Sequence, residues 1–221
     1  MSYDPEKHHR QSHRLKGYDY SLSAPYFITL CTERFLCLFG NVEQKQMLPN
    51  EQGKMVEGWL TEIENKFPGV RIDSFQIMPN HLHAIICIMG AGLDMAAKFG
   101  IGIEDLDLES ADDNCGTPLA LGKAGHTQPV PEQPNLGQII QWFKTMTTNN
   151  YIRGVREAGW QPFPKRLWQR DYFDHIVRDE VTLERTRDYI RNNPLYWSLE
   201  REHPDRIGSG TFADWLQENE L

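Results

Sequence analysis

Long hydrophobic runs are absent from this sequence. Among its 221 residues, no uninterrupted apolar stretch approaches the roughly 18 to 20 residues that a membrane-spanning helix needs. Residues 1–16 are polar and rich in His, Lys and Arg, and they contain no apolar core typical of a signal peptide. Both absences argue against a membrane or secreted protein, and we expect a soluble protein of the cytoplasm.

Cysteine is scarce, and no two of the cysteines form a Cys-x-x-Cys pair. The four cysteines are Cys31, Cys37, Cys87 and Cys115. Their spacing supports neither a disulfide framework nor a zinc knuckle. We therefore expect reduced thiols that are mostly buried.

Basic residues are fewer than acidic ones, which gives the chain a net charge of −8. Such a balance argues against a nucleic-acid-binding protein unless the charge is unevenly distributed. Residues 91–135 carry eight acidic and two basic side chains, and residues 198–221 carry six acidic and two basic ones. The rest of the chain has a net charge of +2. This distribution is compatible with a polyanionic partner, although a charge run is also common on an ordinary solvated face.

The spacing of apolar residues predicts an alternation of strands and helices. Pro68, Pro79 and Pro194 mark predicted ends and turns, and Asn135 and Asp179 are predicted helix N-caps. The predicted elements are a strand at 25–32, a helix at 51–67, strands at 70–78 and 82–89, a helix that follows Asn135, a strand at 166–173 and a helix at 180–193.

This order of elements predicts an α+β fold, a ferredoxin-like sandwich with an antiparallel sheet and one additional C-terminal helix. We assign residues 1–197 to one domain and residues 198–221 to an acidic tail. Within the domain, residues 91–135 are rich in Gly, Pro and Asp and are predicted to be an acidic, flexible insertion. A fold class alone does not select a function.

Two histidines one residue apart stand at the head of an apolar, β-branched run, in Met78-Pro79-Asn80-His81-Leu82-His83. Side chains of a strand repeat their direction every two residues, so His81 and His83 project from the same face. Two neighbouring imidazoles supply half of a metal site. The alternative is a pair of solvent-facing strand residues without a chemical role, because two ligands do not close a site.

Tyr189 and Asn193 lie four residues apart on the last predicted helix. At about 100° per residue, four steps bring two side chains to within about 40° of each other, one turn apart. A phenol and an amide oxygen can therefore address one point. The alternative is that Tyr189 is a packing residue and that Asn193 is a helix C-cap before Pro194.

Taken together and in order, these motifs resemble the IS200-like single-tyrosine (HUH) transposases, in particular the branch associated with repetitive extragenic palindromes. The likeness runs from about Tyr18 to Trp197. The segments that carry it are Met78-Pro79-Asn80 with His81-Leu82-His83, Phe143-Lys144, Leu167-Trp168-Gln169, Tyr172-Phe173-Asp174-His175, and Tyr189-Ile190 with Asn193-Pro194.

The resemblance implies a role for each matching residue. His81 and His83 match paired metal ligands, Asn193 matches the amide that completes the metal site, and Tyr189 matches the nucleophile. His175 matches a recurrent histidine, from which we expect a polar contact near the site. Mixed nitrogen and oxygen ligation suits Mg²⁺ or Mn²⁺, although Zn²⁺ or Ni²⁺ can bind such ligands more tightly.

By the same resemblance, the protein would cleave single-stranded DNA near a hairpin, keep the 5′ phosphate on the tyrosine and release a 3′-hydroxyl. It would act as a monomer or a homodimer in DNA transposition. Single-strand sites combine basic residues with aromatic stacking platforms. The candidates for DNA binding are Arg10, Arg14, Lys16, Trp142, Lys144, Lys165, Arg166 and Arg170. Trp168 lies in an apolar segment, which favours a core position over a stacking platform.

Two other functions are compatible with parts of the sequence. A metallohydrolase could use His81 and His83 for zinc-bound water, but Ile85 occupies the next alternate position and the motif does not continue as His-x-His-x-Asp-His. A noncatalytic nucleic-acid-binding module could share the fold. The presence of every candidate catalytic residue argues against such a decayed site.

Overall fold

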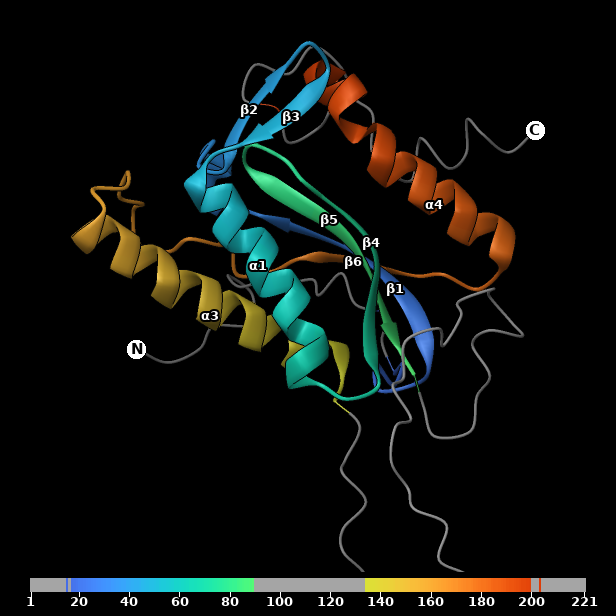
Figure 1. The fold of residues 1–221 in the computed structure, drawn as a ribbon. Helices are drawn as coiled ribbons and strands as arrows, with labels where there is room; N and C mark the ends of the chain where they lie inside the picture. The colour runs from blue at the N-terminus through green and yellow to red at the C-terminus, as the bar shows by residue number, and fades with distance from the viewer. Residues whose placement is uncertain (1–14, 16, 90–133, 200–202, 204–221) are drawn as a thin grey trace, which may run out of the picture.

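A four-stranded antiparallel sheet with helices on both faces forms the body of the protein (Figure 1). The computed structural model describes residues 15, 17–89, 134–199 and 203. Three predicted features fall outside the described residues: the basic side chains of Arg10, Arg14 and Lys16, nearly all of the acidic insertion, and most of the acidic tail. Within the described part, no helix is both long and apolar enough to cross a membrane.

The strands of the sheet follow the order β4-β5-β1-β6, and all neighbours are antiparallel. This arrangement confirms the predicted α+β fold with an additional C-terminal helix. The elements are β1 (Ala24–Cys31), the 3-10 helix η1 (Glu33–Phe35), β2 (Gly40–Glu43), β3 (Gln46–Pro49), α1 (Glu51–Lys66), β4 (Val70–Ile77), β5 (His81–Ile88), α3 (Leu136–Glu157), β6 (Phe173–Ile176), α4 (Glu180–Asn192) and the 3-10 helix η2 (Asn193–Leu199).

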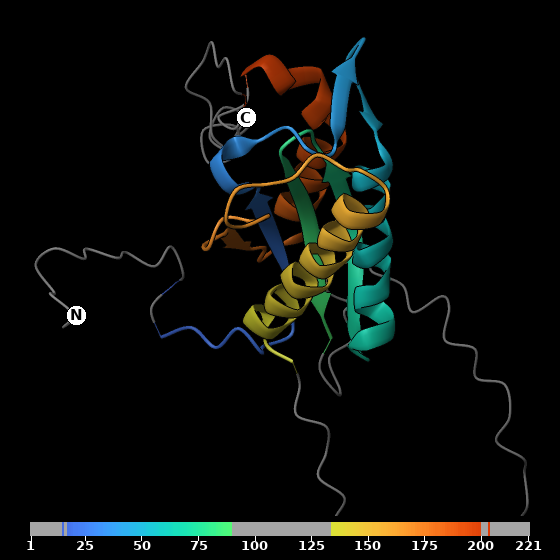
Figure 2. The ribbon, with the colours of Figure 1, turned by 90° about the vertical axis from the view of Figure 1, so that its left-hand side faces the viewer.

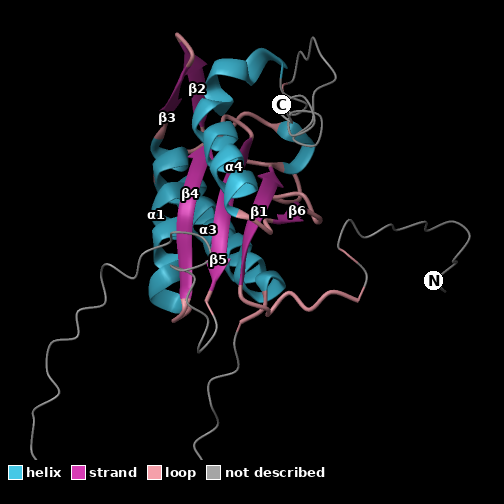
Figure 3. Ribbon diagram, turned by 90° about the vertical axis from the view of Figure 1, so that its right-hand side faces the viewer, coloured by secondary structure: helices cyan, strands magenta, loops and turns pink. Residues whose placement is uncertain are grey.

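The two faces of the sheet carry different layers. Helices α1 and α3 cover one face (Figure 2), and α4 alone lies over the other (Figure 3). Alternate residues of the central strands enter two separate cores. The core under α1 and α3 includes Tyr26, Ile28, Leu30, Leu82, Ala84 and Ile86. The core under α4 includes Phe27, Ile85, Cys87, Val177, Leu183, Tyr189 and Ile190.

The predicted helix boundaries are confirmed by their caps. The Asn135 side chain accepts from the backbone of Gln138, whose own side chain accepts from the backbone of Asn135. Asp179 accepts from the backbone of Thr182 at the start of α4. These caps satisfy amide groups that have no partner within the helix. The first helix ends at Lys66, before Pro68 as predicted.

The predicted strand at 166–173 is wrong. The segment contributes one isolated bridge, between Thr32 and Trp168, and the strand that pairs with β1 is Phe173–Ile176. The apolar residues on which the strand was predicted are part of the core instead. Trp168 is buried, and its indole N–H donates to Thr147 of α3. The expectation that Trp168 is a core residue is thus confirmed.

The hairpin of β2 and β3 was not predicted, because its four-residue strands carry little apolar alternation. The predicted end of the last α-helix before Pro194 is confirmed, and the chain continues as the 3-10 helix η2. The expectation for the cysteines needs correction. Of the three described cysteines, none of which forms a disulfide, Cys87 is buried, Cys31 half-buried and Cys37 exposed, so they are not mostly buried.

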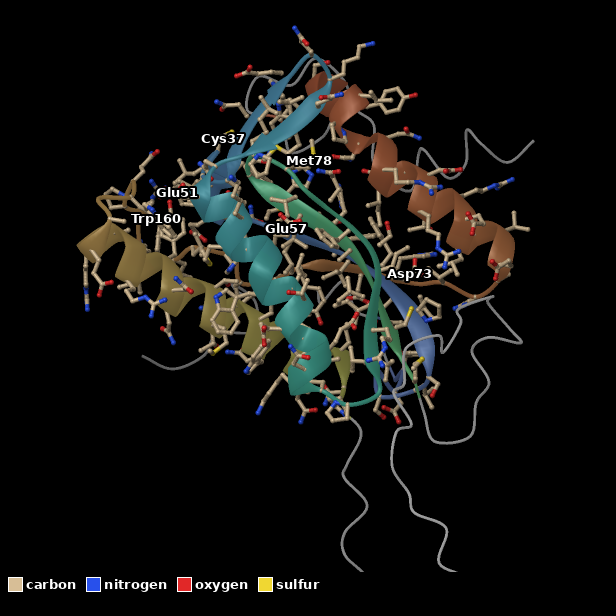
Figure 4. All side chains as sticks on the ribbon, in the orientation of Figure 1. Cys37, Glu51, Glu57, Asp73, Met78 and Trp160 are labelled. Atoms are coloured by element: carbon tan, nitrogen blue, oxygen red, sulfur yellow. The ribbon has the colours of Figure 1, made fainter. Side chains whose placement is uncertain are left out.

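Two helical glycines offer a matched test of the packing. A Cβ at Gly154 of α3 would overlap the ring of Trp160, which donates to Glu51 at the start of α1 (Figure 4). A Cβ at Gly58 of α1 would meet no atom within 4 Å. We expect Gly154→Ala to lower the free energy of unfolding by about 1–3 kcal/mol. Gly58→Ala should raise it by up to about 1 kcal/mol. Urea unfolding measures both, and equal effects would contradict the packing of α3 described above.

Candidate active site

His81 and His83 lie on the α4 side of β5, and both side chains are buried, with relative exposures of 0% and 2%. Their Nε2 atoms are 3.1 Å apart. The predicted common face is therefore confirmed, and the alternative of two solvent-facing residues is wrong. Burial of two imidazoles next to each other requires that their nitrogens find partners within the protein.

The hydrogen bonds of Asn80 determine which nitrogen of His81 carries a proton. The Asn80 Nδ2 donates to the carbonyl of Phe35 at 3.0 Å, so the Asn80 Oδ1 faces His81 Nδ1 at 2.9 Å. An amide oxygen only accepts, so His81 Nδ1 must be the donor. In neutral His81 the proton is then on Nδ1, and Nε2 presents a lone pair.

Thr29 plays the corresponding part for His83 from the neighbouring strand. Thr29 and His83 are directly opposite in the register of β1 and β5, and Thr29 Oγ1 is 2.9 Å from His83 Nδ1. Because His81 Nε2 accepts, His83 Nε2 donates to it and His83 Nδ1 accepts from the hydroxyl. A threonine hydroxyl can also accept. The His83 proton can therefore move to Nδ1, and both Nε2 lone pairs would then face the same point.

Burial keeps this pair neutral. Desolvation lowers the pKa of His81 to about 3, and the side-chain interaction with Asn193 opposes this shift. Desolvation also lowers the pKa of His83, and the neighbouring charge of His81 lowers it further. Metal ions bind the neutral form of imidazole, so both residues are in the ligating state near neutral pH.

Tyr189 lies over His83 from the last two turns of α4. The two ring centroids are 5.2 Å apart at an interplanar angle of 65°, and the Phe27 ring lies 6.0 Å from the Tyr189 ring. The Tyr189 side chain is 7% exposed and belongs to the core under α4. The helix thus places a phenol beside the imidazole pair, on the face that the pair occupies.

Asn193 is both the C-cap of α4 and part of the site. Its backbone N–H bonds to the carbonyl of Ile190, and its side chain is 1% exposed and lies beside that of His81. The capping role and the site role, which are alternatives from sequence, are therefore compatible. Tyr189 and Asn193 bracket the last turn, so one helix end brings both side chains to the two histidines.

The donor set fits a divalent cation. Two nitrogens bound to one ion at about 2.0–2.1 Å, with bonds at right angles, lie about 3 Å apart, which matches the 3.1 Å between the two Nε2 atoms. Within the described part of the chain, no group of three or more His, Cys, Asp or Glu residues could hold a metal. A site in this part of the chain would therefore need another kind of ligand, and the amide oxygen of Asn193 can supply it. Together with His81 and His83, it could hold an ion with positions left open for other ligands.

Three contacts of the site were not anticipated from sequence. Asn80 stood next to the histidines in the motif, but nothing in the pattern assigned it a role. Thr29 carried no signal, because its contact depends on the register between β1 and β5. Trp197 of η2 lies against His81 with 5.8 Å between the rings, and it also contacts His203.

His175 lies beside the site rather than within it. It pairs with Phe27 across β1 and β6, so the two residues share a face of the sheet. His175 also lines a cavity of about 330 Å³ together with Arg178 and Thr182. Burial lowers its pKa, and the charge of Arg178 lowers it further. The expected polar contact near the site stays a prediction.

The described DNA-binding candidates fall into two groups. Trp142 packs edge-on against Trp59 and Phe67 between α1 and α3, and the Lys144 ammonium bonds to the carbonyls of Gln169 and Arg170. These two side chains therefore have structural partners. The second group is exposed and basic, and it consists of Lys165, Arg166 and Arg170.

Comparison with known proteins gives a family but no activity. No family model matches this chain. A protein of Haemophilus influenzae described as uncharacterized is 36% identical over 203 residues, which cover 92% of this chain and 98% of that protein. The chain belongs to the same family as this relative.

Among solved structures, one with a lower sequence identity has a similar fold over part of its length. It is a REP-associated tyrosine transposase bound to a REP hairpin, with a TM-score of 0.47 and 14% identity, covering 83% of this chain and 73% of that one. A similarity of this size does not assign an activity to this chain.

The hydrogen bonds of the histidine pair predict specific tautomers. In protein dialysed against a chelator, neutral His81 should carry its proton on Nδ1, because the Asn80 amide oxygen accepts from it. Neutral His83 should carry its proton on Nε2, because the lone pair of His81 Nε2 accepts from it. Nitrogen chemical shifts of ¹⁵N-labelled histidine measure this. Thr29→Val should alter the shifts of His83 and leave the tautomer of His81 unchanged. An Nε2-protonated His81 would contradict the assigned network.

Proposed function

We propose that this protein is a metal-dependent endonuclease and strand transferase that cleaves single-stranded DNA near hairpins through a covalent 5′-phosphotyrosine. The main support is the position of Tyr189, whose ring lies 5.2 Å from that of His83 in a site with two neutral imidazoles and a buried amide. A nucleophile beside a cation site is an arrangement suited to metal-dependent phosphodiester cleavage.

The proposed ligands are His81, His83 and Asn193, and the proposed ion is Mg²⁺ or Mn²⁺. When bound, the cation would polarise a phosphate oxygen and stabilise the negative charge that develops on it. Asn80 and Thr29 would orient the two imidazoles through Nδ1. Such orienting partners are common around metal-bound histidines.

The chemical step belongs to Tyr189. Its phenolic oxygen forms a bond to phosphorus, the bond from phosphorus to the 3′ oxygen breaks, and the leaving oxygen takes up a proton to become a 3′-hydroxyl. The phenol loses its proton, which requires a lowered pKa or a base because the reference value is about 10. A 3′-hydroxyl can later attack the phosphotyrosine and rejoin the strand. No nucleotide cofactor is needed, since the covalent link retains the energy of the broken bond.

An exposed basic segment next to the site supports a DNA partner. The backbone N–H of Gln169 bonds to the carbonyl of Cys31, which is opposite His81 in the register of β1 and β5. The flanking residues Arg166 and Arg170 are exposed. The chain therefore carries positive charge past the histidine end of the sheet, where phosphates can be neutralised.

Tyr189→Phe tests the nucleophile. Labelled single-stranded DNA carrying a hairpin should give a covalent protein adduct with Mn²⁺ on a denaturing gel, and Tyr189→Phe should abolish the adduct. Tyr196→Phe is the matched control, because Tyr196 is half exposed on η2. An adduct that survives Tyr189→Phe would refute the assignment, and metal-dependent release of nucleotides without an adduct would favour a hydrolase.

His81→Ala separates catalysis from binding. Loss of one of the three proposed ligands should lower the cleavage rate at least about 100-fold, because the cation contributes several kcal/mol to the transition state. Affinity for the same DNA should change little, since phosphate contacts supply most of it. Chelation of the metal from the unmodified protein should reproduce this result. Equal loss of cleavage and affinity would instead indicate a structural histidine.

A further inference from the structure

Strand β4 contains a bulge at Asp73. Ile72 pairs with Ile86 and Ser74 pairs with Ile85, so Asp73 is the extra residue between two consecutive partners. Before the bulge, even-numbered residues such as Ile72 pack toward α1 and α3, and after it odd-numbered residues such as Phe75 do so. The bulge leaves Asp73 as an extra residue on the α4 side and reverses the alternation of the residues that follow it.

The Asp73 carboxylate, on the α4 side of β4, binds helix α4. Arg187 donates from Nε to Asp73 Oδ2 at 2.8 Å and from Nη2 to Asp73 Oδ1, a two-pronged ion pair. The Asp73 side chain is 8% exposed and that of Arg187 is 20% exposed. Figure 4 labels Asp73 on the side of β4 that faces α4. Such a fork fixes direction as well as distance.

Arg187 and Tyr189 lie on opposite flanks of the buried stripe of α4. Residues two positions apart on a helix diverge by about 160°. Arg187 reaches the edge strand β4, whereas Tyr189 contacts Phe27 and His83 on the central strands. The apolar contacts between them, from Leu183 and Ile190, are non-directional, so they favour burial of this face more than one particular rotation of the helix. A roll of about 20° would move a phenol oxygen by about 3 Å.

From this geometry we infer that the Asp73–Arg187 ion pair is a positioning device that fixes the rotation of α4 and thereby holds Tyr189 against His83. The expected effect on the rate of DNA cleavage rests on the proposed function, but the expected position of the Tyr189 phenol does not. Misplacement by about 1 Å can slow a reaction about 100-fold. A device that merely stabilised the fold would leave the ring contact of Tyr189 with His83 unchanged wherever the fold is retained, whereas a rotational one would not.

Arg187→Lys is the discriminating variant, because lysine keeps the charge and loses the fork. Arg191→Lys is the matched control on the same helix, since Arg191 pairs with Asp188 and both side chains are more than half exposed. With saturating DNA, Arg187→Lys and Asp73→Asn should each slow adduct formation roughly 10- to 100-fold. Affinity for DNA should stay within about twofold, and the double variant should be no slower than the slower single one.

A second measurement reports on α4 without any DNA. In metal-free protein, nuclear Overhauser contacts between the Tyr189 and His83 rings should be present in the unmodified chain and in Arg191→Lys. They should be lost in Arg187→Lys while the circular dichroism of the fold is retained. If the unmodified protein forms no adduct, the proposed function fails, and these contacts still decide the role of the ion pair.

Cys87 gives an independent chemical readout. It is fully buried in the core under α4, and burial raises its pKa. In a chain with Cys31, Cys37 and Cys115 replaced by serine, a maleimide should label Cys87 roughly tenfold faster after Arg187→Lys if α4 is released. Ring contacts and labelling that match the unmodified chain would overturn the inference. So would lost ring contacts with an unchanged rate of adduct formation.

Discussion

Two neutral imidazoles can be buried side by side only if their nitrogens have partners, and the rest of the site follows from this requirement. Asn80 and Thr29 satisfy the two Nδ1 atoms, which turns both Nε2 atoms toward each other. The Asn80 amide is held in turn by the carbonyl of Phe35. The pair is thus oriented before any ligand arrives, and α4 needs only to bring a phenol and an amide to a point that is already defined.

One face of the sheet carries the larger apolar core, and the other carries the candidate site. Two helices cover one face and contribute most of the apolar core, so that face holds the strands in register. The other face has a smaller core under one helix, which contains the site. The apolar contacts of that helix are non-directional. The ion pair of Asp73, at the bulge of β4, with Arg187 supplies a directional contact to the helix that carries Tyr189.

The parts of the fold that could be predicted are those written in local patterns. Apolar periodicity and caps located the three long helices, and the alternation within the apolar strands put His81 and His83 on one face. The strand predicted around Trp168 was wrong, because a segment buried by tertiary packing can have the same apolar and aromatic composition as a strand. The bulge in β4 could not be predicted, because it is defined by the pairing with β5 and not by the sequence of β4 alone.

The sequence by itself determined which side chains could do chemistry, because the spacing of His81 with His83 and of Tyr189 with Asn193 follows from the geometry of a strand and a helix. Only the tertiary structure decided that the two pairs meet, since they lie more than a hundred residues apart along the chain and are brought together by the packing of α4 over β5. It also selected Thr29, Trp197 and the Asp73–Arg187 pair, whose roles depend on register and helix rotation. Local patterns encode direction within an element, whereas contacts between elements arise only from packing.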